Sequence, residues 1–165
     1  MQNHEIELQV GVKVLLKNKQ GKYLLLRRNP KKYPEVGPKW DIVGGRTETG
    51  SSLIENLKRE IKEEVGLDYI GEPKLVAAQD IIVHRFTDST NDTDKKPRKE
   101  IEKHVVRLTY TGEIEGEPVV NNNDNNNNDN LEAKWFTTEE IKNIKTNELD
   151  SYFQKLLEND TIRLS

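Results

Sequence analysis

The chain contains no cysteine, which excludes disulfide bonds, thiolate nucleophiles and cysteine-ligated zinc sites. It has no apolar run that approaches the roughly 20 residues of a membrane-spanning helix. Its first residues, Met1 to Glu5, do not form a signal-peptide pattern. These absences predict a soluble, cytoplasmic protein with no membrane partner.

Apolar residues are also scarce, at 33% of the chain, while charged residues make up another 33%. This balance indicates a hydrophilic surface together with some disordered stretches. The length of 165 residues suits a single domain, 1–165, with a real core. The net charge of −3 argues against a nucleic-acid partner held by charge.

What the chain does have is a cluster of three glutamates, Glu60, Glu63 and Glu64, at helical spacing. Residues three or four apart share one helix face, with Cβ atoms roughly 5–6 Å apart, so these carboxylates repel one another. A hard divalent cation such as Mg²⁺ would offset that repulsion and keep waters for a phosphate substrate. The opposite face carries an apolar residue at every fourth position: Leu53, Leu57, Ile61 and Val65.

The alternative interpretation is a solvated surface helix whose acidic residues are offset by Lys58, Arg59 and Lys62. The residues upstream of the helix favour a ligand site instead. Glycines at 44, 45 and 50 permit tight turns and close approach of a ligand to the main chain. Ser52 and Glu55 form a capping-box pattern, and Gly66 suits a left-handed C-terminal cap. A helix is therefore expected from about Ser52 to Gly66.

The segment Gly45–Leu67 resembles the Nudix box, G-x5-E-x7-R-E-U-x-E-E-x-G-U, in which U is an aliphatic residue. The spacing is intact over the whole segment, and the matching residues are Gly45, Arg59, Glu60, Ile61, Glu63, Glu64, Gly66 and Leu67. One position departs, because Ser51 stands where the pattern has its first glutamate. The motif is highly specific, and it displaces the surface-helix interpretation.

The resemblance implies an α/β fold, an α/β/α sandwich with a mixed sheet between helices. It also implies metal ligands at Glu60, Glu63, Glu64 and a backbone carbonyl of the Gly44–Gly45 turn, with Mg²⁺ or Mn²⁺ as the cofactor. Glu63 and Glu64 are expected to be catalytic as well, and Arg59 to hold the carboxylates in place. The first glutamate of the box is a supporting residue, so Ser51 is expected to reduce activity without abolishing it. Glu48 is a candidate replacement for the missing charge.

Outside the box, the resemblance suggests a further acidic ligand or base, first Glu132 and second Asp129. Arg27 or Arg28 is expected to bind substrate phosphate, and Gly45 to approach the substrate. Trp40 precedes the glycine turn, where relatives often carry an aromatic residue. It is a candidate for substrate binding, with packing into the core as the alternative.

The reaction implied is metal-dependent hydrolysis of a nucleoside diphosphate linked to another moiety, so the expected partner is a small nucleotide. The segment Asp80–Phe86 lacks the proline typical of ADP-ribose hydrolases and the tyrosine typical of diadenosine-type hydrolases. This favours a non-standard or damaged nucleoside triphosphate as substrate. ADP-ribose or another nucleotide sugar stays an alternative, as does a weakly active or non-catalytic nucleotide-binding domain. A nucleic-acid contact through Lys95 to Lys99 and a homodimer are also left open.

Hydrophobic patterning predicts the remaining elements. Strands are expected at 8–16, 22–27, 40–43, 105–112 and 133–136, and 73–83 is expected to be a strand pair or one long bent strand. Two further helices are expected at 138–144 and 149–157. Mobile loops are expected at 87–100 and at 121–130, because neither stretch can bury apolar area to offset the entropy of ordering.

Overall fold

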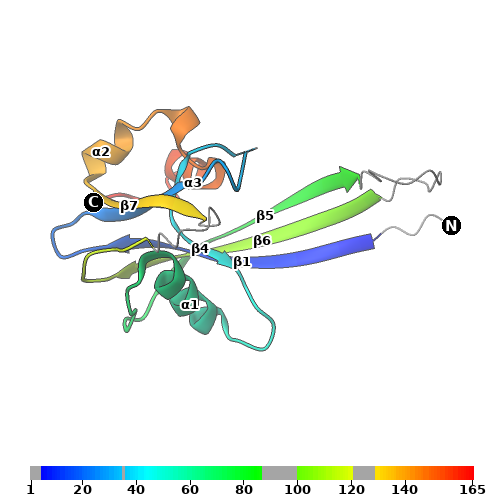
Figure 1. Ribbon diagram of the computed structural model, residues 1–165, viewed down its shortest axis with the longest axis horizontal. Coiled ribbons are helices and arrows are strands. Elements are labelled where there is room, and N and C mark those ends of the chain that lie inside the picture. The colour runs from blue at the N-terminus through cyan, green and yellow to red at the C-terminus, as the bar shows by residue number, and fades with distance from the viewer. Residues whose placement is uncertain (1–4, 35, 87–99, 121–128) are drawn as a thin grey trace.

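The computed structural model describes residues 5–34, 36–86, 100–120 and 129–165 (Figure 1). Its strands are β1 (Glu5–Lys17), β2 (Tyr23–Arg28), β3 (Trp40–Asp41), β4 (Val43–Arg46), β5 (Lys74–Phe86), β6 (Glu100–Glu113) and β7 (Asn130–Phe136). Its helices are α1 (Leu53–Val65), α2 (Thr138–Lys142) and α3 (Ser151–Glu158), with a short 3-10 turn at Thr146–Glu148. The predicted order of elements is confirmed except at 40–43, where the single expected strand is two strands, β3 and β4, and β4 includes Gly44 and Gly45 of the expected turn. No helix among these described residues is long and apolar enough to cross a membrane.

The strands form one mixed sheet with the order β3-β2-β1-β6-β5, to which β4 is added on β1 and β7 on β2. β1 runs parallel to β6 and antiparallel to β2 and β4. Helix α1 covers one face of the sheet, and α2 and α3 cover the other (Figure 1). This arrangement confirms the α/β/α sandwich.

Side-chain alternation along the strands builds a core on each face. Val12 and Val14 of β1 pack toward α1, whereas Leu15 packs toward α2 and α3. The predicted apolar stripe of α1 is buried at Leu57, Ile61 and Val65. It differs at Leu53, which lies in the first turn of the helix and is exposed.

The predicted ends of α1 are confirmed by their hydrogen bonds. The Glu55 amide donates to Ser52 Oγ at 3.2 Å, and the Ser52 amide donates to Glu55 Oε2 at 2.7 Å. Gly66 closes the helix at a φ of 72°, a left-handed conformation that favours glycine. The box helix is therefore fixed at both ends by residues of the motif itself.

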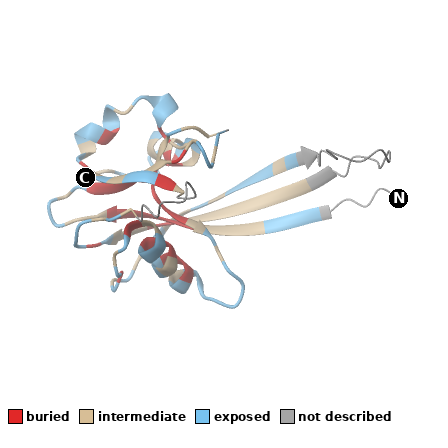
Figure 2. Ribbon diagram, in the orientation of Figure 1, coloured by how far each residue is buried: buried red, intermediate tan, exposed pale blue. Residues whose placement is uncertain are grey.

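Several strands are longer than the sequence predicts. β6 pairs with β1 on one side and with β5 on the other, along the full lengths of β1 and β5. Together the three strands extend well past the helices as a three-stranded arm (Figure 1). Much of this arm is exposed or only half-buried (Figure 2). Tertiary pairing overrides the weak apolar pattern there, because strand propensity depends on neighbouring strands.

The prediction of a loop at 121–130 is wrong at its last residue, because Asn130 begins β7 and pairs with Arg28. The loop predicted at 87–100 is likewise wrong at Glu100, which begins β6. Residues 87–99 and 121–128 lie outside the described residues. These include the basic residues Lys95, Lys96, Arg98 and Lys99 and most of the asparagine run.

Candidate active site

The three box glutamates open onto one cavity of about 450 Å³ beside the glycine turn. Glu60, Glu63 and Glu64 line it together with Gly44 and Gly45. Its cationic lining residues are Lys13, Arg28, Arg46 and Arg107. Carboxylates and cations therefore share a single cavity, the arrangement expected of a site for a metal-bound anion.

Both glycines of the turn are required by close packing. Gly44 has a φ of 139°, and a Cβ there would overlap the Val12 carbonyl oxygen. A Cβ on Gly45 would lie 2.6 Å from both carboxylate oxygens of Glu60. The missing side chain at Gly45 therefore leaves room for the Glu60 carboxylate directly against the main chain of β4.

Glu64 is held by hydrogen bonds from two strands, β4 and β7. Its Oε2 accepts a 2.8 Å hydrogen bond from the Gly44 amide, and its Oε1 accepts one of 3.0 Å from Asn130 Nδ2. Burial raises the pKa of Glu64, although Lys13 and the Gly44 amide act to lower it. The raised pKa makes this carboxylate a better proton acceptor than an exposed glutamate.

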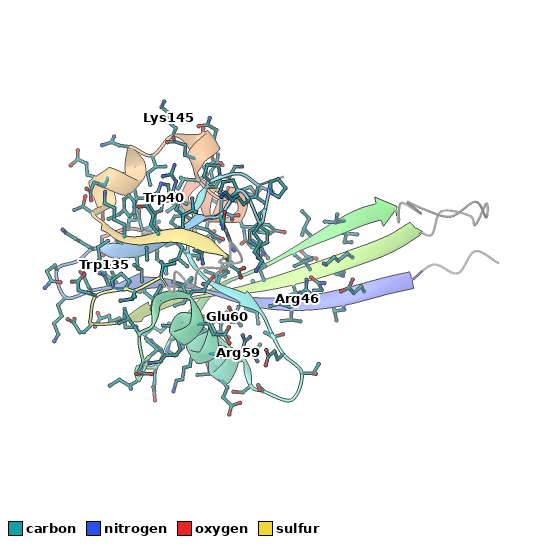
Figure 3. The ribbon with its side chains drawn as sticks, viewed as in Figure 1. Trp40, Arg46, Arg59, Glu60, Trp135 and Lys145 are labelled. Carbon is teal, nitrogen blue, oxygen red and sulfur yellow. The ribbon has the colours of Figure 1, made fainter. Side chains whose placement is uncertain are left out.

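Arg59 bridges the other two carboxylates. Its Nη2 lies 2.8 Å from Glu60 Oε1, and its Nη1 lies 2.9 Å from Glu63 Oε2. Figure 3 shows Arg59 and Glu60 next to each other on α1, with Arg46 nearby, and Nη2 also donates to the Arg46 carbonyl at 3.1 Å. Burial raises the pKa of Glu60 against the opposing effect of Arg59.

The loop before α1 brings Glu48 toward the same arginine. Glu48 Oε2 lies 3.8 Å from Arg59 Nε, while Ser51 makes no side-chain contact to Arg59 among the interactions of the described residues. Glu48 is therefore the carboxylate of this loop that approaches Arg59.

Asn56 holds that loop, and sequence reasoning missed it. Its Oδ1 accepts from the Glu48 amide at 2.8 Å and from Arg59 Nη2 at 3.2 Å. Its Nδ2 donates to the Ser52 carbonyl at 2.9 Å. The available signal was an amide side chain adjacent to Leu57, where the apolar stripe enters the core.

A buried charge network under the cavity was also missed. Asp41 Oδ2 accepts from Lys13 Nζ and from Arg28 Nη2, each at 2.7 Å. Burial would raise the pKa of Asp41, but Lys13 and Arg28 outweigh it and hold that pKa well below its usual range. Burial lowers the pKa of Lys13, whereas for Arg28 it is outweighed by Asp41 and Glu64, which raise the pKa. Arg28 thus lines the cavity while its Nη2 is bound to Asp41.

The remaining predicted residues divide between two places. Arg28 and Asp129 line the cavity, but Arg27, Trp40 and Glu132 do not. Arg27 Nη1 lies 3.4 Å from Glu132 Oε1 on paired strands, and its guanidinium lies 5.9 Å from the centre of the Trp40 ring.

Trp40 packs edge-on against Phe136 with ring centres 4.8 Å apart, which places it beside the core under α2 and α3. The structure thus places Trp40 against the core, as the alternative prediction has it, and not in the cavity. The roles in substrate binding and catalysis assigned to these residues stay predictions.

The donor set fits a divalent cation. Glutamate oxygens and a glycine-turn carbonyl are the hard ligands that Mg²⁺ and Mn²⁺ take. The described residues contain no ready-made cluster of three His, Cys, Asp or Glu side chains. In this structure the Arg59 guanidinium pairs with Glu60 and Glu63 and offsets part of their charge.

The NUDIX domain family model matches residues 7–157, which is nearly the whole chain. The chain belongs to the Nudix family. Enzymes of this family hydrolyse a nucleoside diphosphate linked to another moiety and generally need a divalent metal, and this chain is a hydrolase of that kind. A comparison with functionally curated proteins gives no match.

Solved structures agree on the fold of this Nudix hydrolase. A MutT protein from Methanosarcina mazei Go1 is 23% identical with a TM-score of 0.66, and the match covers 94% of each chain. A MutT Nudix hydrolase from Burkholderia pseudomallei is 22% identical with a TM-score of 0.61, covering 92% of this chain and 97% of that one. A MutT protein from Bacillus halodurans is 15% identical with a TM-score of 0.62, covering 94% and 84%.

Proposed function

We propose that this Nudix hydrolase is a Mg²⁺- or Mn²⁺-dependent pyrophosphohydrolase that acts on a non-standard or damaged nucleoside triphosphate. The observation that carries the proposal is the single cavity in which the glutamates of α1 meet Lys13, Arg28 and Arg107. A triphosphate has more negative charge than a nucleotide sugar, so it gains more from several cations in one cavity.

The residues divide the work of hydrolysis. Glu60, Glu63 and Glu64 would hold the cation, which neutralises the diphosphate oxygens and lowers the pKa of a bound water. Glu64, whose pKa burial raises, accepts the proton of the attacking water. Arg28 donates to a phosphate oxygen through the guanidinium nitrogens that Asp41 leaves free. Arg59 keeps Glu60 and Glu63 in position.

The late acidic residue is proposed to be Asp129 in preference to Glu132. Asp129 lines the cavity and pairs with Lys32, while Glu132 lies outside it and pairs with Arg27. Glu132 was the stronger candidate from sequence because it lies closer to Trp135 and Phe136. The register of β7 shifts between Glu132 and Asn130, however, and only Asn130 keeps its side chain on Glu64.

A second candidate is a weakly active nucleotide-binding domain. The observation that favours it is the replacement of the first box glutamate by Ser51, with Glu48 reaching Arg59 only at 3.8 Å and largely exposed. Screening by solvent weakens such a pair. ADP-ribose and other nucleotide sugars belong in the same substrate panel.

The test is turnover of a nucleotide panel by the wild type, Glu63→Gln and Glu64→Gln at limiting Mg²⁺. Each substitution is expected to lower the rate at least about tenfold, because even a residue that only supports a ligand is worth 10–100-fold. Asp129→Asn is expected to lower the rate more than Glu132→Gln, which serves as the matched control on β7. Unchanged turnover in both α1 variants would refute the assignment, and no turnover by the wild type would favour the binding domain.

A further inference from the structure

The three-stranded arm exposes apolar side chains that the core does not use. Ile6 and Leu8 of β1 are 64% and 65% exposed, and Ile82 of β5 is 50% exposed. By register, Leu8, His104 and Ile82 lie side by side across the three strands and share one face. Among the described residues, no helix covers this end of the sheet (Figures 1 and 2). The arm therefore exposes a group of neighbouring apolar side chains, which monomeric soluble proteins rarely do.

The outer edge of the arm is β5. It is the last strand in the sheet order, and among the described residues it pairs with β6 alone. Natural edge strands are usually protected by lysine, proline or a bulge. The irregularity in β5 lies between Leu75 and Ala77, and Gln79–His84 contains neither lysine nor proline. This edge is open to another strand.

We propose that a second copy of this chain adds its own β5 to this edge, antiparallel about a two-fold axis at Ile82. A two-fold perpendicular to the sheet sets Ile82 opposite its own counterpart. In that register Ile81 lies opposite Val83 of the second copy, so apolar residues meet on both faces. The bodies of the two copies lie at opposite ends of the paired arms.

Charge complementarity selects this register. With the axis at Ile82, Asp80 of each copy lies opposite His84 of the other. Within one chain, His84 Nδ1 lies 4.0 Å from Glu102 Oε2, and Asp80 Oδ2 lies 2.8 Å from His104 Nε2. Pairing of the two copies places Asp80 of one copy beside His84 of the other, between the His84–Glu102 and Asp80–His104 pairs. Acid and histidine then alternate along one row. Moving the axis to Ile81 or to Val83 sets Ile82 opposite Asp80 or His84, an apolar residue against a polar one.

The free edge of β1 is a weaker candidate. Only its residues before Gly11 are open, because β4 pairs with β1 from Gly11 onward. That short edge carries Glu5 and Glu7, so two copies would bring like charges together. β5 offers the longer edge and the complementary charges.

The absence of cysteine allows a direct test in the full chain. Ile82→Cys introduces one thiol at the axis, where facing Cβ atoms in an antiparallel pair lie about 4.5–5.5 Å apart, near the range of a disulfide. Mild oxidation or a short bis-maleimide should link this variant into a dimer. Leu75→Cys, exposed on the same strand but far from the axis, should stay monomeric. Equal linking of both variants, or linking of Leu8→Cys in place of Ile82→Cys, would overturn the proposal.

Sedimentation of the unmodified chain tests association without a cross-link. Strand-edge interfaces are small and weak, so the dimer should accumulate as the protein concentration rises. Ile82→Lys sets two positive charges across the axis and should abolish the dimer, whereas Leu75→Lys, an equivalent exposed substitution on β5, should not. Both variants should keep the circular dichroism of the wild type. A chain that is monomeric at its highest soluble concentration would refute the inference.

Discussion

Glu64 is held between two opposing demands. Its hydrogen bonds to Gly44 and Asn130 fix its position beside the cavity, but burial disfavours its charge and raises its pKa. The proposed role of Glu64 in cation binding requires the ionised carboxylate, and burial makes that form costly to the fold.

The sign of this effect gives a prediction for Glu64→Gln. The folded-state pKa lies above the ordinary value of 4.5, so the native chain binds more protons than the unfolded chain in the window between those two values. Stability contributed by protonated Glu64 is complete below pH 4.5 and is lost as the pH rises through the folded-state pKa. Glu64→Gln does not titrate in this window. We therefore expect the Tm of the variant, relative to that of the wild type, to increase as the pH rises. Each kcal/mol of relative stability corresponds to roughly 2–4 °C in Tm.

The measurement is Tm of both proteins, free of metal, from about pH 4 to pH 8. Glu55→Gln is the control of opposite sign. Its backbone hydrogen bond to Ser52 lowers the pKa of Glu55, so its contribution to stability is present above the ordinary pKa and is lost as pH falls. A Tm difference for Glu64→Gln that shrinks with rising pH would contradict the burial argument.

At the scale of elements, the loop before α1 and the helix form one unit. Asn56 bonds to the Glu48 amide and the Ser52 carbonyl, and Arg59 links this loop to Glu60 and Glu63. Glu48 approaches Arg59 from the loop, whereas the residue in the pattern's own position, Ser51, offers only its backbone carbonyl to Asn56. The carboxylate that approaches Arg59 is therefore Glu48, which precedes the pattern's own position, Ser51, in the same loop.

This arrangement predicts how two substitutions combine. Glu48→Gln should lower turnover a few-fold, since it removes a supporting charge but no metal ligand. Ser51→Glu should raise wild-type turnover modestly and should restore the Glu48→Gln variant, because an acidic group there also meets the positive end of the helix dipole. Rates at a series of Mg²⁺ concentrations measure both effects.

Ser51→Gln, which has the same size without the charge, is the control for this pair. If Ser51→Glu slows an active enzyme, Ser51 belongs to a rearranged site and Glu48 already fills the role. If the wild type shows no turnover and Ser51→Glu creates it, the natural role is nucleotide binding and not hydrolysis.

At the scale of the whole molecule, one sheet joins two cores. Leu57 of α1 lies in the core on one face, and Phe153 of α3 lies in the core on the other. Strands β1 and β2 contribute residues to both, as Leu24 and Leu25 show by alternation. The two faces should therefore unfold together as one domain.

Truncation on either face tests this cooperativity. Leu57→Ala is expected to cost about 2–5 kcal/mol and Phe153→Ala about 3–5 kcal/mol, because both side chains are fully buried. Each variant should keep a single denaturant transition when followed by tryptophan fluorescence and by circular dichroism. Separate transitions for the two probes would mean that the helical layers unfold as independent units.

Local signals in the sequence determined much of this protein. Helix periodicity placed the glutamates on one face of α1, and Ser52 and Gly66 ended that helix as their chemistry requires. Alternation located most strands, and the intact box spacing predicted the family that residues 7–157 match. These features depend on residues a few positions apart, so the sequence carries them directly.

Tertiary structure decided the rest, because the partners come from distant parts of the chain. Asp41 meets Lys13 from 28 positions away, and Asn130 meets Glu64 from 66 away. The fold places Asp129 at the cavity and Glu132 outside it. Pairing with β6 extends β1 and β5 beyond the ends that the hydrophobic pattern predicts. Side-chain periodicity fixes which face a residue occupies, but only strand order and register fix what lies opposite to it.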